Sequence, residues 1–113
     1  MSANPSMTEA TVDNHLQAFF RKSVDGVVQD YANESILIVS SGPLRGLGEI
    51  QRFIETMPAG FLEAFKMRTQ EFVGEIGYIV WDASPWVHFA TDTFVVRNGK
   101  IMMQTFAAHP PSW

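Results

Sequence analysis

Residues 94–103, FVVRNGKIMM, decide how the second half of this 113-residue chain folds. Asn98 and Gly99 stand there between two apolar runs. Both residue types tolerate the positive φ angles that a tight hairpin turn requires. The segment therefore predicts two antiparallel strands joined at residues 98–99.

The strand-like pattern extends outward from this hairpin. Breaks at residues 73–74 and 84–85, together with the turn at residues 98–99, divide the chain after residue 61 into four strands in series. The β-branched and aliphatic run over residues 35–40 predicts one earlier, buried strand. We therefore expect a mostly antiparallel sheet that comes largely from the second half of the chain.

Helical periodicity dominates the first half. Apolar residues recur at steps of three and four over residues 8–22, with Thr8 as the expected N-cap. Ser23 is expected to cap a second, short helix whose apolar face ends at Tyr31. Residues 47–57 predict a third helix.

This order of elements predicts an α+β fold, in which three helices from the N-terminal half cover the concave face of a strongly curved sheet. Residues 8–109 are expected to form one domain, with a flexible tail at residues 1–7 and a second tail at residues 110–113. A curved sheet with helices across its open side encloses a conical space, which favours a pocket.

Composition and charge exclude several classes of function. The net charge of -4 provides no basic surface for a phosphate backbone, so we expect no nucleic-acid partner. The absence of cysteine excludes disulfides, thiolate metal sites and a cysteine nucleophile. No signal peptide and no apolar run near the roughly 20 residues of a membrane helix are visible, so we expect a cytoplasmic protein without a membrane partner.

Several local strings, in this order, resemble the nuclear-transport-factor-2-like superfamily, which includes the SnoaL-like polyketide cyclases and the ketosteroid isomerases. They are VDGVV at 24–28, DYANES at 30–35, GLGEI at 46–50, DTF at 92–94 and NGKI at 98–101. The resemblance implies a conical barrel, a homodimer through the outer sheet face and one deep apolar pocket per subunit. It does not imply one reaction, because the superfamily combines enzymes with pure binding modules.

Asp92 is the first candidate catalytic residue. It lies mid-strand between Ala90 and Phe94 on its own face, where burial disfavours the charged carboxylate and raises its pKa. A neutral carboxyl can donate a hydrogen bond to a developing oxyanion. The resemblance places the oxyanion-hole acid of the isomerases at this position. The alternative is that Asp92 caps a backbone group or pairs with a polar neighbour.

The register of the hairpin determines which residues face Asp92. A type I turn with a Gly bulge at residues 98–99 places Gln104 opposite Asp92, whereas a two-residue type I′ turn places Thr105 there. We expect the bulged register, with Phe106 and Ala108 on the Asp92 face.

His15 is the second candidate catalytic residue, on the apolar stripe of the first helix. The resemblance places at this position the tyrosine that shares the oxyanion hole. Imidazole can donate a hydrogen bond or serve as general acid or base, and a pairing with Asp92 would orient it and keep it protonated. The alternative is a buried histidine whose hydrogen bonds are satisfied within the core.

The aspartate base that the isomerases carry at the end of the first strand has no match, because residues 38–42 read IVSSG. A serine hydroxyl cannot take a proton at neutral pH without a base of its own, so steroid isomerisation is disfavoured. Relatives that resemble limonene epoxide hydrolase use an arginine between two aspartates. The arginines at positions 45, 52, 68 and 97 offer no such arginine between two inward carboxylates, so this reaction is disfavoured too. Histidine and tyrosine near Asp92 leave a scytalone-dehydratase-like reaction open.

The expected ligand is a small hydrophobic compound in an aromatic pocket. We expect no cofactor and no metal, because His15, His88 and His109 show no ligand spacing. The expected substrate-binding residues are Tyr31, Phe53, Trp81, Phe94, Gln104 and Phe106.

The outer sheet face is expected to expose an apolar patch that a homodimer would bury. Its expected members are Thr91, Thr93, Val95, Ile101 and Met103. Two functions remain open. One is an isomerase, cyclase or dehydratase acting through His15 and Asp92 on a small carbonyl compound, and the other is a non-catalytic ligand-binding or dimerisation module.

Overall fold

The computed structural model describes residues 5–58 and 60–109. Its elements are α1 (Pro5–Phe20), α2 (Val24–Gln29), β1 (Tyr31–Val39), β2 (Gly42–Arg45), α3 (Gly46–Ile54), α4 (Phe61–Ala64), β3 (Lys66–Val73), β4 (Ile76–Ala83), β5 (Val87–Arg97) and β6 (Lys100–His109). The expected tail at residues 110–113 and the first four residues of the expected N-terminal tail lie outside this description.

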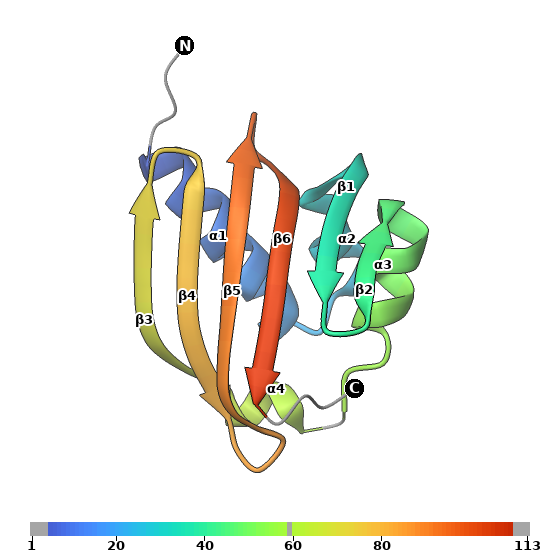
Figure 1. The fold of residues 1–113 in the computed structure, drawn as a ribbon, viewed down its shortest axis with the longest axis vertical. Helices are drawn as coiled ribbons and strands as arrows, with labels where there is room; N and C mark the ends of the chain where they lie inside the picture. Colours follow the sequence, from blue (N-terminus) through green and yellow to red (C-terminus); the bar gives the residue numbers. More distant parts are fainter. Residues whose placement is uncertain (1–4, 59, 110–113) are drawn as a thin grey trace.

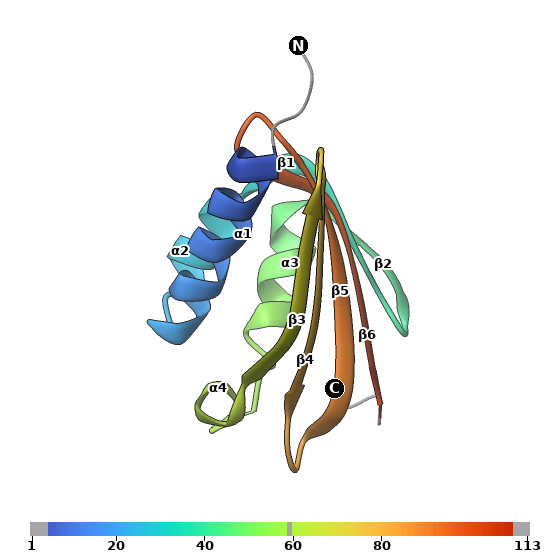
Figure 2. The ribbon, with the colours of Figure 1, turned by 90° about the vertical axis from the view of Figure 1, so that its left-hand side faces the viewer.

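One curved sheet of six strands forms the body of the molecule, in the order β2-β1-β6-β5-β4-β3 (Figure 1). All neighbouring strands are antiparallel except β1 and β6, which are parallel. Figure 2 shows α1, α2 and α3 on the concave side of the sheet, and α4 at the lower end of the molecule. The α+β prediction is confirmed, with a curved sheet that is not closed into a barrel because β2 and β3 are its free edges.

The helices differ from the predictions at their ends. α1 begins at Pro5, and Thr8 lies inside the helix, where its hydroxyl donates to the Gly74 carbonyl at 2.6 Å instead of capping. Ser23 does cap α2, because its side chain accepts a hydrogen bond from the Gly26 backbone at 3.0 Å. Tyr31 begins β1 and does not belong to the second helix, so that part of the prediction was wrong.

Two short elements escaped the sequence analysis. β2 contains Gly42 and Pro43, two residue types that are uncommon inside strands. Pro43 is tolerated because β2 is an edge strand and pairs only with β1. α4 has four residues, too few to show a helical period.

The β5–β6 hairpin turns at residues 98–99 as predicted, but the expected type I turn with a Gly bulge was wrong, and so was the register that it implies. Asn98 and Gly99 have φ angles of 54° and 73°, so the turn is the two-residue type with positive φ at both central positions. A bulge then follows, because Val96 pairs with Ile101 whereas Val95 pairs with Met103. The bulge places one extra residue in β6 and shifts every later pair.

The register shift corrects two predictions. Asp92 lies opposite Phe106, and Gln104 lies opposite Phe94, so the expected Asp92–Gln104 pairing was wrong. The expected and observed partners of Asp92 differ by two residues, and a shift of two leaves the shared face unchanged. Ile101, expected on the outer face, pairs with Val96 and is fully buried in the core.

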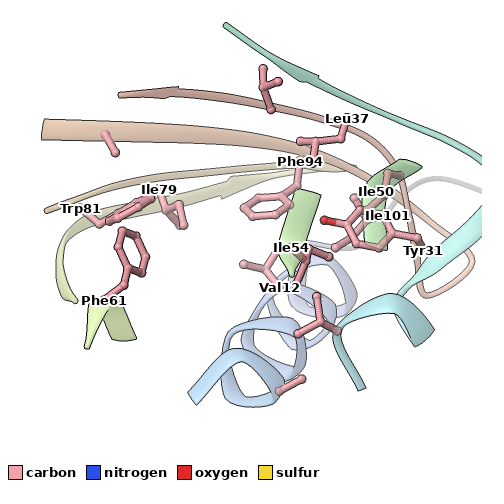
Figure 3. Close-up of a cluster of buried hydrophobic side chains, with 14 of the residues drawn as sticks. Val12, Tyr31, Leu37, Ile50, Ile54, Phe61, Ile79, Trp81, Phe94 and Ile101 are labelled. Carbon is pink, nitrogen blue, oxygen red and sulfur yellow. The ribbon is translucent and has the colours of Figure 1, made fainter. Parts of the chain in front are cut away.

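The core lies between the helices and the concave sheet face. Val12, Ile50, Ile79 and Phe94 have relative exposures of 0–1%, and they come from two helices and two strands. Figure 3 shows this cluster, with Phe61 and Trp81 together at one end and Tyr31 at the other. Among the described residues, no helix combines the length and the apolar character needed to cross a membrane.

Candidate functional site

A cavity opens between the concave sheet face and helices α1, α3 and α4, and its walls are mainly aromatic. Its volume is about 80 Å³, less than the roughly 150 Å³ of an engineered core cavity that holds one benzene molecule. A short apolar chain can therefore enter the cavity as it stands, whereas a ring of the size of benzene enters only when side chains of the wall move. All eight predicted site residues line this cavity: His15, Tyr31, Phe53, Trp81, Asp92, Phe94, Gln104 and Phe106.

Three aromatic rings form one wall and show how the strands position the apolar part of the site. Trp81 on β4 stacks with Phe106 on β6 at a centroid distance of 5.8 Å and an interplanar angle of 11°. Phe53 on α3 lies 6.3 Å from Phe106, so the helix extends the same wall. Flat apolar groups pack well against such a surface.

Asp92 is the carboxylate that lines this cavity, in the middle of β5 and 6% exposed. The Trp81 indole N–H donates to its Oδ1 at 2.7 Å, and the Gln104 amide Nε2 donates to its Oδ2 at 2.7 Å. Both donors are neutral. Each carboxylate oxygen keeps one further acceptor position, since a carboxylate offers about four in all.

Burial governs the charge of Asp92. Removal from water raises the pKa of this carboxyl from 3.8 to about 6, and the hydrogen bonds from Trp81 and Gln104 only partly oppose that rise. At neutral pH the carboxylate is therefore the main form, with the acid form close by. A group with this pKa can accept and return a proton near physiological pH.

His15 on α1 is held by protein partners at both ring nitrogens. Nδ1 lies 3.3 Å from Oδ2 of Asp30, and Nε2 lies 3.3 Å from the Tyr31 hydroxyl. The rings of Phe19, Tyr31 and Phe94 surround the imidazole in edge-to-face contacts at centroid distances of 5.0–6.0 Å. His15 therefore presents no free ring nitrogen to the cavity.

The expected direct pairing of His15 with Asp92 was wrong, because the carboxylate beside His15 is Asp30. Burial lowers the pKa of His15 below its ordinary value and outweighs the opposing effects of Asp30 and the Val27 backbone. The neutral imidazole is thus favoured, opposite to the expectation that a carboxylate partner would keep the ring protonated.

Tyr31 and Gln104 bridge the distance between the two candidates. The Tyr31 hydroxyl donates to Gln104 Oε1 at 2.5 Å. Burial, together with the charges of Asp92 and Asp30, raises the pKa of Tyr31 well above 10, so this hydroxyl keeps its hydrogen. The outcome is one polar chain across the core that is buried between its exposed end at Asn14 and Trp81: Asn14, Asp30, His15, Tyr31, Gln104, Asp92 and Trp81.

Sequence reasoning missed Asp30 in this chain. Asp30 is the C-cap of α2 and directly precedes β1, and Asn14 donates to its second oxygen at 3.0 Å. The useful signal was a carboxylate that ends a short helix and stands next to Tyr31 in the sequence. It became informative only with the packing of α2 against α1.

The other histidines and serines considered for chemistry lie outside the cavity. His88 is exposed beside Ser84, and His109 is exposed at the end of β6. Ser40 and Ser41 are exposed in the turn between β1 and β2. Within residues 5–58 and 60–109, no three metal-ligating side chains come together.

Solved structures of other proteins share this architecture. No protein-family model matches the sequence, and no curated protein matches it. Among solved structures, an NTF2-like protein of unknown function from Burkholderia xenovorans LB400 has a TM-score of 0.75 at 20% identity, over 91% of this chain and 83% of that chain. The chain has the nuclear-transport-factor-2-like fold.

Two further structures show how widely this fold is used. A SnoaL-like protein of unknown function from Burkholderia thailandensis E264 has a TM-score of 0.74 at 12% identity, over 96% of this chain and 98% of that chain. A de novo designed protein with a curved β-sheet has a TM-score of 0.75 at 14% identity, over 93% and 87% of the two chains. Proteins named for ketosteroid isomerase and polyketide cyclase also match. Function must therefore be argued from the site.

Proposed function

We propose that this NTF2-like protein binds a small apolar compound and transfers a proton to or from it through Asp92. The observation that carries the proposal is a carboxyl with a pKa of about 6 that lines an aromatic cavity and receives hydrogen bonds from two neutral donors. Proton abstraction or donation at such a group serves isomerisation, cyclisation and dehydration alike.

Asp92 itself then supplies the base that the sequence analysis found missing at residues 38–42. The carboxylate form dominates at neutral pH, and each oxygen has an acceptor position that neither Trp81 nor Gln104 occupies. A carbon acid seated in the cavity can therefore meet a carboxylate without water around it. His15 acts behind the site, because both of its ring nitrogens face protein groups.

A direct test follows exchange of the α-hydrogens of cyclohexanone and cyclohex-2-enone for deuterium in D₂O, measured by NMR. The wild-type protein is expected to accelerate exchange over buffer, and Asp92→Asn is expected to lose the acceleration while keeping its fold. Wild-type exchange equal to that in buffer contradicts proton transfer to this class of compound.

The alternative function is binding without chemistry, and the almost wholly apolar lining of the cavity favours it. Phenol and toluene separate the two, because they are closely matched in size and only phenol can donate a hydrogen bond to Asp92. Tighter binding of phenol in the wild type, lost in Asp92→Asn, supports a ligand contact at Asp92. Equal binding of both ligands without any exchange identifies a binding module.

The expected homodimer also stands as a proposal, on a corrected set of residues. Two rows of cross-strand neighbours cross the convex face from β4 to β1, and most of their members are apolar. Met103→Lys places a charge in this surface. A dimer in sedimentation analysis that becomes monomeric in Met103→Lys supports the proposal, and a monomeric wild type refutes it. The rows are Ile76, Val95, Met103, Ile36 and Tyr78, Thr93, Thr105, Ile38.

A further inference from the structure

The buried polar chain has more links than its hydrogens can fill at neutral pH. Between Asp92 and Asp30 there are four links, joined by Gln104, Tyr31 and His15. The Gln104 amide fills the first link and the Tyr31 hydroxyl fills the second. The last two links both depend on the hydrogens of the His15 ring.

A neutral imidazole carries only one N–H group. Asp30 is an acceptor at Nδ1, so the single hydrogen of neutral His15 belongs there. Nε2 is then an acceptor that faces the oxygen of Tyr31, whose only hydrogen points to Gln104. The distances agree with this count, because the Tyr31–Gln104 separation is 2.5 Å and the Tyr31–His15 separation is 3.3 Å.

One added proton completes all four links, and either His15 or Asp92 can hold it. On His15, it gives Nε2 a hydrogen for the Tyr31 oxygen, and the other bonds remain as they are. On Asp92, the new O–H donates to Gln104 once the amide has turned over. The amide nitrogen then donates to Tyr31, whose hydroxyl donates to His15 Nε2. The two arrangements contain the same hydrogens, with an Asp92 O–H bond in one and a His15 Nε2–H bond in the other.

We propose that Asp92 and His15 share one proton through Tyr31 and Gln104, and that the orientation of the Gln104 amide follows the position of that proton. Tyr31, Gln104 and His15 are then positioning residues that set the proton affinity of Asp92. This inference rests on the proposed function for its use, since a proton taken from a ligand by Asp92 is stabilised by the rest of the chain.

Among the described residues, the polar and charged groups that face His15 and Asp92 can be named. His15 faces the Asp30 carboxylate, the Tyr31 hydroxyl and the Val27 backbone. Asp92 faces the neutral Trp81 and Gln104 side chains. The described contacts of the two groups include no lysine or arginine, so no fixed positive charge holds the proton away from either end.

The test is an NMR titration of the ligand-free protein between pH 4 and pH 9. It follows the Asp92 carboxyl carbon, the His15 ring nitrogens and the Gln104 side-chain amide. In the wild type, all three are expected to change with one common midpoint, because the shared proton leaves the chain in a single step. Tyr31→Phe is expected to abolish the change of His15 at the Asp92 midpoint.

The chain offers a matched control, because its only other tyrosine, Tyr78, is exposed on the outer face of β4. Tyr78→Phe should leave the common midpoint in place. Tyr31→Phe keeps the charge of Asp92, so a through-space effect on His15 would survive it. Gln104→Met cuts the same connection at the next link and replaces Tyr31→Phe if that variant does not fold.

Separate midpoints for Asp92 and His15 in the wild type would overturn the shared proton, as would a common midpoint that survives loss of the Tyr31 hydroxyl. Neither result depends on a ligand. The exchange and binding experiments with cyclic ketones and phenol can therefore fail or succeed independently of this titration.

Discussion

Asp92 and His15, the two groups that can hold the proton of the polar chain, are both buried and differ in their hydrogen-bond partners. Asp92 is 6% exposed and His15 is 1% exposed. Asp92 meets only neutral donors, whereas His15 has the Asp30 carboxylate against one nitrogen. Burial nevertheless has the larger effect at both ends, because it raises the pKa of Asp92 and lowers that of His15.

Asp92 and His15 differ in the hydrogen-bonding positions that they leave open to the cavity, and not in their burial. Asp92 keeps open acceptor positions in the cavity wall, while both nitrogens of His15 are used by protein groups. A strongly buried titratable group is often a functional candidate, and of these two only Asp92 has acceptor positions that no described protein group occupies.

The largest expected effect comes from a change of Asp92, the proposed proton-transfer group. Asp92→Asn is expected to lower the rate of cyclohexanone α-hydrogen exchange by about 10²–10⁴-fold, the usual contribution of a general base. His15→Gln is expected to lower it less than about tenfold, because His15 acts through Tyr31 and Gln104. Equal losses in the two variants would show that His15 meets the substrate.

The next effect concerns stability and depends on pH. The folded-state pKa of Asp92 is raised from 3.8 to about 6, so its contribution to stability is complete below pH 3.8 and is lost as the pH rises through about 6. Asp92→Asn removes the ionised form and should raise the free energy of unfolding by about 3 kcal/mol at pH 8. Chemical denaturation at pH 8 and pH 4 measures this, and an equal gain at both pH values contradicts it.

His15 has the opposite pH dependence. Its folded-state pKa lies below 6.5, so its contribution to stability is present above pH 6.5 and is lost as the pH falls through the folded-state value. Relative to the wild type, His15→Gln should therefore be more stable at pH 5 than at pH 8. Denaturation curves at the two pH values test the sign, and a constant difference would show that His15 does not titrate differently on unfolding.

The smallest expected effect compares the two tyrosines. Tyr31→Phe leaves Gln104 Oε1 without its buried donor and should cost about 1–3 kcal/mol of unfolding free energy. Tyr78→Phe removes a hydroxyl from the exposed face and should change stability by less than about 0.5 kcal/mol. Equal costs would mean that the Tyr31 hydroxyl contributes little to the native state.

Much of the fold could be read from local patterns. The Asn98-Gly99 turn, the breaks between the later strands and the Ser23 cap are determined by neighbouring residues, and all three were predicted. The extra residue of β6 near Met102 was not, because a bulge depends on packing across the whole sheet. That bulge changed the partner of Asp92 and moved Ile101 into the core.

The eight predicted site residues all line the cavity, whereas the pairings expected among them were wrong. Period-two alternation placed Asp92, Gln104 and Phe106 on one face, and it survived a register error of two residues. Asp30 was missed because its contact with His15 depends on how α2 packs beside α1. Hydrogen-bond partners between distant elements are tertiary facts, which no local pattern contains.

The carboxyl-carbon chemical shift of Asp92 as a function of pH tests most directly whether Asp92 can transfer a proton to a ligand in the cavity. We expect the titration of Asp92 to have a midpoint near pH 6 in the free protein. Phenol should change this midpoint, and toluene should not. A midpoint near 4 that neither compound changes would contradict this expectation, because Asp92 would then be an ordinary carboxylate with no place in proton transfer.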